Sequence, residues 1–166
     1  MNEHKMTVVI GVDCETDVGS FTPFYEGVKH GIPILCDMFA RQNIRGTFFF
    51  TGDAARDNPE IARLAASAPN EIGCHALYHE TVGDELFPIP NMKPLLPHEV
   101  YPRLELATRW VEEASGTRPV SFRCPRLWGS TSVVNALEKL GYKTDATYPM
   151  YFYRKRFAPY HPSAAD

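Results

Sequence analysis

Two histidines four residues apart are the first feature of the sequence that could do chemistry. His75 and His79 lie in the segment EIGCHALYHE. This spacing places both imidazoles on one face of a strand or a helix, and neutral imidazole is the commonest protein ligand for zinc-like ions. The helical HExxH pattern of metalloproteases does not fit, because residue 76 is alanine. An isolated pair of this kind is more often two surface histidines.

Two carboxylates follow an apolar run near the N-terminus. In GVDCETD, Asp13 and Glu15 point to one side of an extended segment and Cys14 to the other. Neighbouring carboxylates repel each other, and removing them from water is unfavourable, so a nearby cation would relieve both effects. The alternative is an ordinary acidic loop. If the carboxylates share a sheet edge with His75 and His79, the set resembles a catalytic metal site with open positions for water and substrate.

An arginine ends another apolar run, in SFRCPR. Arg123 beside Asp13 would keep that carboxylate charged and oriented, whereas the alternative is a surface arginine paired with any acid. Strand alternation turns Cys14 and Cys124 to the opposite face. We interpret these two cysteines, and Cys74, as small core residues rather than ligands.

The segments that must position these residues alternate between strand and helix patterns. Strands are predicted over Thr7–Val12, Gly46–Thr51, Glu71–Cys74, Pro119–Cys124 and Lys143–Tyr148. Helices are predicted over Ile32–Gln42, from Asp53 or Asn58-Pro59 onward, over Glu99–Ala114 and over Thr131–Leu140. The proline-rich segment 84–97 is predicted to be a loop. This α/β order predicts a mainly parallel sheet, open or closed as a barrel, with its site at the carboxyl ends of the strands.

Helical spacing also predicts which side chains face the core. The expected inward residues are Ile32, Leu35, Met38 and Phe39, then Ile61, Leu64 and Ala65, then Val100, Leu104, Ala107 and Val111. No element is expected in the tail from Met150.

Composition and charge narrow the classes of function. The chain has 166 residues, 44% hydrophobic and 22% charged, which predicts a single domain over residues 1–166. A net charge of −3 without a long basic run predicts no nucleic-acid and no membrane partner. We expect a cytoplasmic protein, because the sequence has neither a signal-peptide pattern nor an apolar run of ~18–20 residues. The four scattered cysteines argue against a disulfide framework.

Taken in order, GVDCETD, TFFFTG, EIGCHALYHE and SFRCPRLWG resemble the motifs of the polysaccharide deacetylase family (NodB homology, carbohydrate esterase family 4). The resemblance covers about Val8 to Tyr148 and implies a distorted (β/α) barrel. By resemblance, His75 and His79 bind a metal, Asp13 is the catalytic base and Arg123 orients it.

Three departures from the family pattern affect what the resemblance implies. The common second aspartate of the first motif is Cys14 here, so we expect Glu15 to be the third metal ligand, with Asp17 in reserve. Asp145, by contrast, agrees with the family, which often has an aspartate at this place, but its role is not settled. No late Leu-x-x-His motif follows, and His161 does not match it, so no general acid is identified. With about five strands, we expect a barrel truncated at the C-terminus.

The resemblance implies a metal-dependent hydrolase of linear amides, and we expect N-deacetylation of an acetylated amino sugar in carbohydrate metabolism. Trp128, Tyr148 and Tyr151 are candidates to stack on the sugar. Two alternatives stay open: a cytoplasmic hydrolase of a small ureide such as allantoin, and a truncated domain that binds metal or ligand without turnover. The expected cofactor is Zn²⁺, although Co²⁺, Ni²⁺ or Mn²⁺ would also suit nitrogen and oxygen ligands. The expected partner is a small-molecule or oligosaccharide substrate, and a homo-oligomer stays open.

Overall fold

Five short parallel strands form one sheet at the centre of the molecule. The computed structural model describes residues 7–18, 21–67 and 69–148. The strands lie side by side in chain order, and every neighbouring pair is parallel. They are β1 (Ile10–Cys14), β2 (Gly46–Phe50), β3 (Glu71–Cys74), β4 (Ser121–Phe122) and β5 (Thr144–Asp145). The predicted α/β class and parallel sheet are therefore confirmed, and the described strands form an open sheet.

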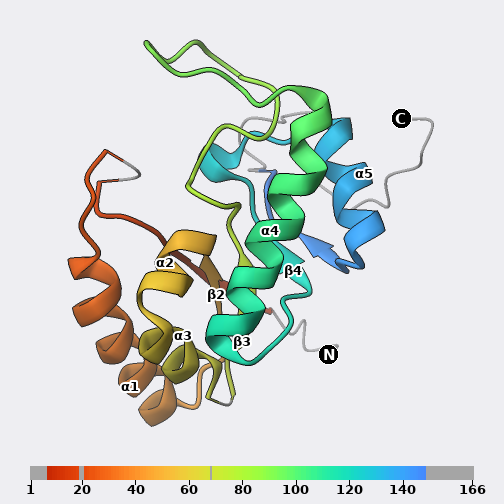
Figure 1. Ribbon diagram of the computed structural model, residues 1–166. Helices are drawn as coiled ribbons and strands as arrows, with labels where there is room; N and C mark the ends of the chain where they lie inside the picture. Colours follow the sequence, from red (N-terminus) through yellow and green to blue (C-terminus); the bar gives the residue numbers. More distant parts are fainter. Residues whose placement is uncertain (1–6, 19–20, 68, 149–166) are drawn as a thin grey trace, which may run out of the picture.

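The helices connect the strands and pack over the sheet (Figure 1). They are η1 (Gly27–Gly31, a π-helical turn), α1 (Ile32–Gln42), α2 (Gly52–Asp57), α3 (Pro59–Ala66), α4 (Pro97–Ser115), η2 (Pro125–Leu127) and α5 (Thr131–Leu140). The long helix α4 packs against α2, α3 and α5, so it ties the two halves of the helical layer together. No helix in the described part of the chain is both long and apolar enough to cross a membrane.

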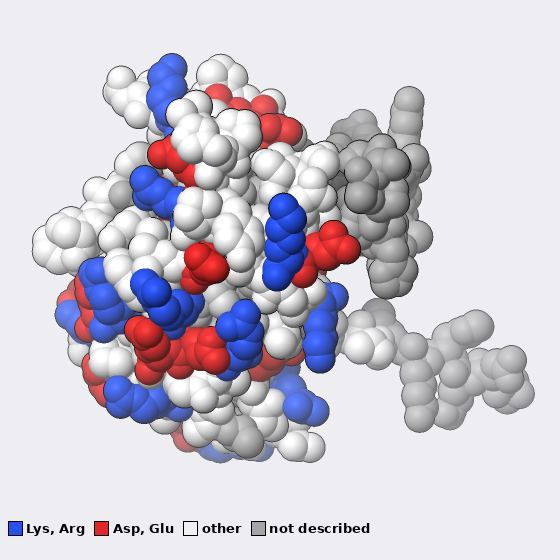
Figure 2. Space-filling view, turned by 45° about the vertical axis from the view of Figure 1, so that its right-hand side comes forward, with Lys and Arg blue, Asp and Glu red and all other residues white. Residues whose placement is uncertain are grey.

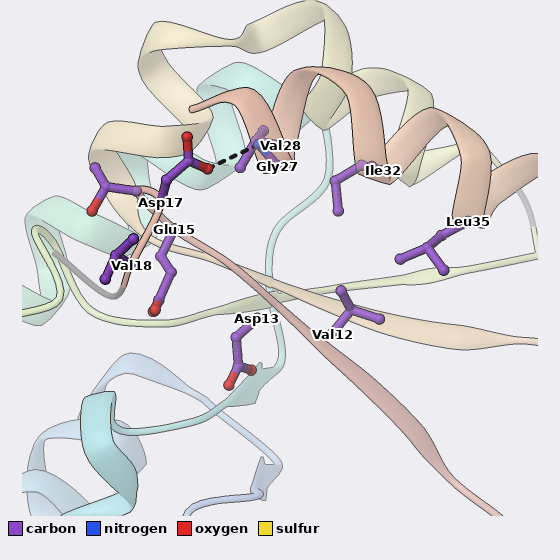
Figure 3. Close-up of a pocket in the computed structure, with 11 residues that line it drawn as sticks. Val12, Asp13, Glu15, Asp17, Val18, Gly27, Val28, Ile32 and Leu35 are labelled. Atoms are coloured by element: carbon purple, nitrogen blue, oxygen red, sulfur yellow. Dashed lines mark hydrogen bonds between the residues drawn. The ribbon is translucent and has the colours of Figure 1, made fainter. Parts of the chain in front are cut away.

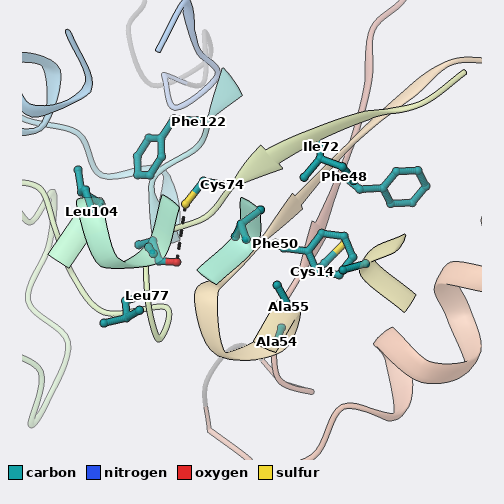
Figure 4. Packing of buried hydrophobic residues seen from close by; sticks show 14 of the residues in the cluster. Cys14, Phe48, Phe50, Ala54, Ala55, Ile72, Cys74, Leu77, Leu104 and Phe122 are labelled. Carbon is teal, nitrogen blue, oxygen red and sulfur yellow. Dashed lines mark hydrogen bonds between the residues drawn. The ribbon is translucent and has the colours of Figure 1, made fainter. Parts of the chain in front are cut away.

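Strand alternation builds the core between the sheet and the helices (Figure 4). The buried strand side chains of this core are Cys14, Phe48, Phe50, Ile72, Cys74 and Phe122, and Ile10 and Val12 of β1 pack against it partly buried. The inward residues predicted for α4 are buried as well. The interpretation of Cys14, Cys74 and Cys124 as core residues is confirmed, because all three are buried and free.

Most strands are shorter than predicted, because they end where pairing with the neighbouring strand ends. β1 begins at Ile10 rather than Thr7, because Ile10 pairs with Gly46, the first residue of β2, and Val8 and Val9 lie exposed beyond that pair. The strands β4 and β5 pair over two residues only. Thr51 leaves the strand and accepts a hydrogen bond from the Ala54 amide, which starts α2.

Two helices follow β2 where one was predicted: α2 begins at Gly52, one residue before the predicted start at Asp53, and α3 begins at the predicted Asn58-Pro59. α2 ends at Asp57, and a new helix, α3, begins with Pro59 in its first turn. Two inward predictions are wrong: Leu64 on α3 and Met38 on α1 are exposed. Ala62 is buried instead of Leu64, because the short side chain allows α3 to pack closely on its neighbours. The predicted loop over 84–97 is confirmed as far as Leu96, and α4 begins at Pro97.

Replacing Phe48 by alanine tests the helix-facing core. Phe48 is 0% exposed and its ring contacts that of Phe39 at a centroid distance of 5.9 Å. We expect the free energy of unfolding to fall by about 3–5 kcal/mol, because the substitution removes buried apolar surface and leaves a cavity. Urea denaturation followed by circular dichroism measures the change. Phe21→Ala is the matched control, since Phe21 is 69% exposed; an equal loss in both variants would contradict this description of the core.

Candidate active site

Three potential ligands converge at the carboxyl edge of the sheet. Glu15, His75 and His79 each offer one ligand atom, and these atoms all lie within 4.8 Å of one another. The Oε2 atom of Glu15 is 2.8 Å from Nε2 of His79 and 3.2 Å from Nε2 of His75. His75 is 1% exposed and His79 8%, so both imidazoles are held inside the protein. The structure therefore brings together the two histidines and the carboxylate that the sequence singled out.

The two histidines lie on a loop, not on one face of a strand or helix as their spacing predicts. β3 ends at Cys74, and the His75 amide still donates to the carbonyl of Phe50 at 2.8 Å. Ala76 and His79 then adopt left-handed backbone conformations, with φ of 64° and 56°. The Gly52 amide, at the start of α2, donates to the carbonyl of Ala76 at 2.9 Å. This conformation of the loop brings the imidazole of His79 back toward that of His75.

The hydrogen bond of His75 fixes which ring nitrogen faces the cluster. Nδ1 lies 2.7 Å from the carbonyl oxygen of Arg123, and because a carbonyl can only accept, Nδ1 carries the proton in this bond. In the neutral ring Nε2 then presents its lone pair toward Glu15. Metal-binding histidines typically make such a hydrogen bond through the ring nitrogen that does not bind the metal.

Glu15 is the acidic centre of the cluster. Its Oε2 atom is buried and has no hydrogen-bond partner of suitable geometry, although two imidazole nitrogens lie close to it. Burial raises the pKa of Glu15, but the adjacent imidazoles of His75 and His79 outweigh that effect and lower it to about 2. Electron pairs on three atoms that face a common point repel each other unless a proton or a cation lies between them. The donor set therefore fits a divalent cation.

The reserve candidate, Asp17, points elsewhere. Its two carboxylate oxygens accept hydrogen bonds from the amides of Glu26 and Gly27, at 3.0 and 2.9 Å. Figure 3 shows Asp17 directed toward Gly27 while Glu15 and Asp13 extend away from it. These amides open the η1 turn, so the Asp17 carboxylate stabilises the start of that helix.

Asp13 lies beside the cluster and is paired with Arg123. Nη1 of Arg123 donates to Oδ1 of Asp13 at 2.8 Å, and the other oxygen, Oδ2, is 4.0 Å from Nε2 of His75. Asp13 and Glu15 also line a hollow of about 270 Å³ between β1 and the first helices (Figure 3). One carboxylate oxygen is therefore held by the guanidinium, and the second faces the histidines.

A set of neighbours fixes the guanidinium of Arg123. Its central carbon lies 4.4 Å from the centroid of the Phe49 ring, a cation–π contact. Nε donates to the carbonyl of Ala146 at 3.2 Å. Gly11 leaves the necessary room, because a Cβ atom there would lie 2.5 Å from Nη2. Gly11 and Phe49 were missed from the sequence, although the glycine two residues before Asp13 was a usable signal.

Asp145 supports this arrangement from the last strand. Oδ1 accepts from the Thr147 amide at 3.0 Å and from the Thr147 hydroxyl, and that hydroxyl oxygen accepts from the Cys124 amide at 2.9 Å. Burial raises the pKa of Asp145, whereas the Thr147 bonds and the charge of Arg123 lower it, with a net rise. Asp145 thus connects β5 to the loop that carries Arg123.

The two predicted sugar-stacking residues that the structure describes lie in different environments. Trp128 is 1% exposed, and the ring of Phe87 packs edge-on against it at 5.1 Å. Tyr148 is half-buried, close to Gly129. Contact of either ring with a substrate stays a prediction, whereas Tyr151 and His161 lie outside the described residues.

Comparison with known proteins identifies the family. A family model described as polysaccharide deacetylase matches residues 19–144, which is most of the chain. The chain belongs to the polysaccharide deacetylase family. A curated relative, the peptidoglycan-N-acetylmuramic acid deacetylase PdaA of Bacillus subtilis, is 24% identical over 126 residues, which cover 75% of this chain and 44% of that protein.

Solved structures of the polysaccharide deacetylase fold resemble this one. A Mycobacterium smegmatis protein assigned to the family superposes with a TM-score of 0.68 at 24% identity, covering 84% of this chain and 50% of that one. BA3943 of Bacillus anthracis, described as a family 4 pseudoenzyme, gives a TM-score of 0.61 at 21% identity, covering 82% and 42%. The chain therefore spans half or less of the length of these relatives, and the likeness to the solved structures concerns the fold.

Substitution of the two nearby acids tests which of them is a ligand. We expect Glu15→Gln to weaken binding of Zn²⁺ by about 100-fold or more, because loss of even an outer partner of a ligand costs 10–100-fold. Asp17→Asn should keep the metal, since the Asp17 carboxylate is engaged by two amides. Metal content after dialysis, measured by plasma mass spectrometry, gives the comparison. Retention in Glu15→Gln together with loss in Asp17→Asn would make Asp17 the ligand.

Proposed function

We propose that this chain carries the active site of a metal-dependent amide hydrolase that removes the N-acetyl group of an acetylated amino sugar. The observation that carries the proposal is the convergence of Glu15, His75 and His79 next to an Asp13 carboxylate held by Arg123. Family membership supports hydrolysis of a carbohydrate amide, and the curated relative is named as a deacetylase of an N-acetylated sugar.

Glu15, His75 and His79 would hold the cation through one carboxylate oxygen and two Nε2 atoms. A divalent ion with nitrogen and oxygen ligands would supply Lewis acidity to the acyl carbonyl, and Zn²⁺, Co²⁺, Ni²⁺ and Mn²⁺ all suit that donor set. Three protein ligands leave positions for substrate and water, which is the arrangement of a catalytic rather than a structural site.

Asp13 is the general base of the proposed reaction. Its Oδ2 atom faces the cluster, 4.0 Å from His75 Nε2, and it takes a proton from the attacking water. Arg123 holds Oδ1, so the carboxylate cannot rotate freely and Oδ2 keeps its direction. The His75 imidazole is oriented by the carbonyl of the same arginine, and one residue therefore aligns the base and a ligand.

The balance of the reaction defines what a product assay must detect. The water oxygen forms a bond to the acyl carbon, and the bond between that carbon and the sugar nitrogen breaks. One proton of the water passes through Asp13, and the leaving amine gains the proton that it needs for departure. The products are acetate and the free amino sugar in equal amounts.

The activity is tested with N-acetyl chito-oligosaccharides as substrate. We expect release of acetate that stops after chelation and returns when Zn²⁺ or Co²⁺ is added. Asp13→Asn should lower kcat by ~10²–10⁴-fold, the usual contribution of a general base, while the metal stays bound. Asp37→Asn, on the exposed face of α1 and paired with Arg41, is the control that should leave kcat unchanged.

Other outcomes of the same assay separate the alternatives. Turnover of allantoin without turnover of the chito-oligosaccharides would replace the sugar amide by a small ureide as substrate. Stoichiometric metal without turnover of either substrate would make the site a binding site. Full activity in Asp13→Asn would remove Asp13 from the mechanism.

A further inference from the structure

A second arginine, three residues after Arg123, reaches the loop that carries the histidines. Nη1 of Arg126 donates to the main-chain carbonyl of His79 at 2.8 Å and lies 3.5 Å from the hydroxyl of Thr81. The side chain is half-buried and spans two segments separated by more than 40 residues of sequence. It therefore contacts the site through the backbone of a proposed ligand, not through its ring.

The backbone at both ends of this contact is in an unusual conformation. His79 has φ of 56°, and Arg126 and Leu127 have φ of 58° and 61°. Residues other than glycine adopt the left-handed region at an energetic cost, and they stay there where surrounding contacts hold them. The Arg126 hydrogen bond is such a contact, because it fixes the carbonyl of the strained histidine.

The electrostatic surroundings place Arg126 near the acidic side of the site. Burial lowers the pKa of Arg126, and the negative charges of Glu15 and Glu80 act in the opposite direction, with a net fall. Glu80, next to His79 in sequence, has a buried Oε1 atom with no hydrogen-bond partner. Arg126 is thus a half-buried cation close to a site proposed to hold another cation. Its own charge opposes metal binding, whereas its hydrogen bond orients a ligand.

We propose that Arg126 is a positioning residue. By binding the His79 carbonyl, it keeps the His79 imidazole directed toward the proposed metal site. This inference rests on the proposed function of the same site. It assigns two tasks to the short segment RCPR: Arg123 aligns Asp13 and His75, and Arg126 aligns His79. One segment then orients both imidazoles from outside the cluster.

The two effects of Arg126 predict opposite results on its removal. If only its charge mattered, Arg126→Met would bind a divalent cation more tightly, because a like charge is lost. If positioning dominates, the same variant binds more weakly, by about tenfold or more, as for other partners that orient ligands. Arg126→Lys keeps the charge and one donor but lacks the planar fork of arginine, so its affinity should lie between those of the parent and of Arg126→Met.

The experiment measures Zn²⁺ affinity by competition with a chromophoric chelator, and the visible absorption spectrum of the Co²⁺-loaded protein. Arg118→Met is the matched control, because Arg118 also donates to a main-chain carbonyl, that of Leu140 at 2.9 Å, but lies before β4, at the opposite end of the strand. We expect weaker Zn²⁺ binding and an altered Co²⁺ spectrum for Arg126→Met, partial recovery for Arg126→Lys, and no change for Arg118→Met. Thermal unfolding of the metal-free proteins reports whether each variant is folded.

Distinct outcomes separate this inference from the proposed function. Unchanged or tighter metal binding in Arg126→Met, with an unchanged Co²⁺ spectrum, would overturn the positioning role and leave the metal centre intact. A parent protein that takes up no Zn²⁺ or Co²⁺ would defeat the metal centre itself, and the role of Arg126 with it. If Arg126→Met does not fold, Arg126→Lys decides: parent-like affinity and spectrum would then refute the inference.

Discussion

The site depends on one buried carboxylate oxygen placed between two imidazole nitrogens. Oε2 of Glu15 lies within 3.2 Å of both Nε2 atoms, and it has no hydrogen-bond donor of suitable geometry. Taking a carboxylate out of water is unfavourable, and imidazole nitrogens compensate only where a proton or a cation lies between them and the carboxylate oxygen. The arrangement becomes favourable with positive charge among the three atoms. This electrostatic requirement explains why the surrounding residues converge on Glu15, and it is the physical reason to assign a cation to the cluster.

Much of the surrounding structure serves to hold these atoms in place without touching a substrate. The His75 amide and Nδ1 are bound by the carbonyls of Phe50 and Arg123, so His75 is anchored both to β2 and to the segment that follows β4. Arg123 is in turn packed on Phe49 and accommodated by Gly11. Because each support comes from an adjacent parallel strand, the short β3 and β4 strands suffice to align the site. A shift of one residue in the register of β1 would turn Asp13 to the core face.

The sequence predicted the elements better than it predicted how the candidate site residues meet. Strand alternation correctly separated Asp13 from Cys14, and helical spacing correctly identified the buried face of α4, because both depend on local periodicity. The loop that joins His75 and His79 could not be foreseen, since its left-handed residues are an alanine and a histidine rather than glycines. Arg126 was missed for a related reason: its role arises from a main-chain hydrogen bond to a distant segment. Such contacts leave no periodic signal in the chain.

The fold alone does not decide whether such a site is active, because the same architecture occurs in a protein described as a pseudoenzyme. In this chain the donors come from the ends of β1 and β3, and the supports from β2, β4, β5 and their loops. Among the described residues β1 and β5 each have one neighbouring strand, so Asp13 lies on an edge strand and Glu15 directly follows it. If the proposed function holds, metal affinity depends on the local geometry at Glu15, His75 and His79, whereas turnover also requires residues that orient the substrate against Asp13.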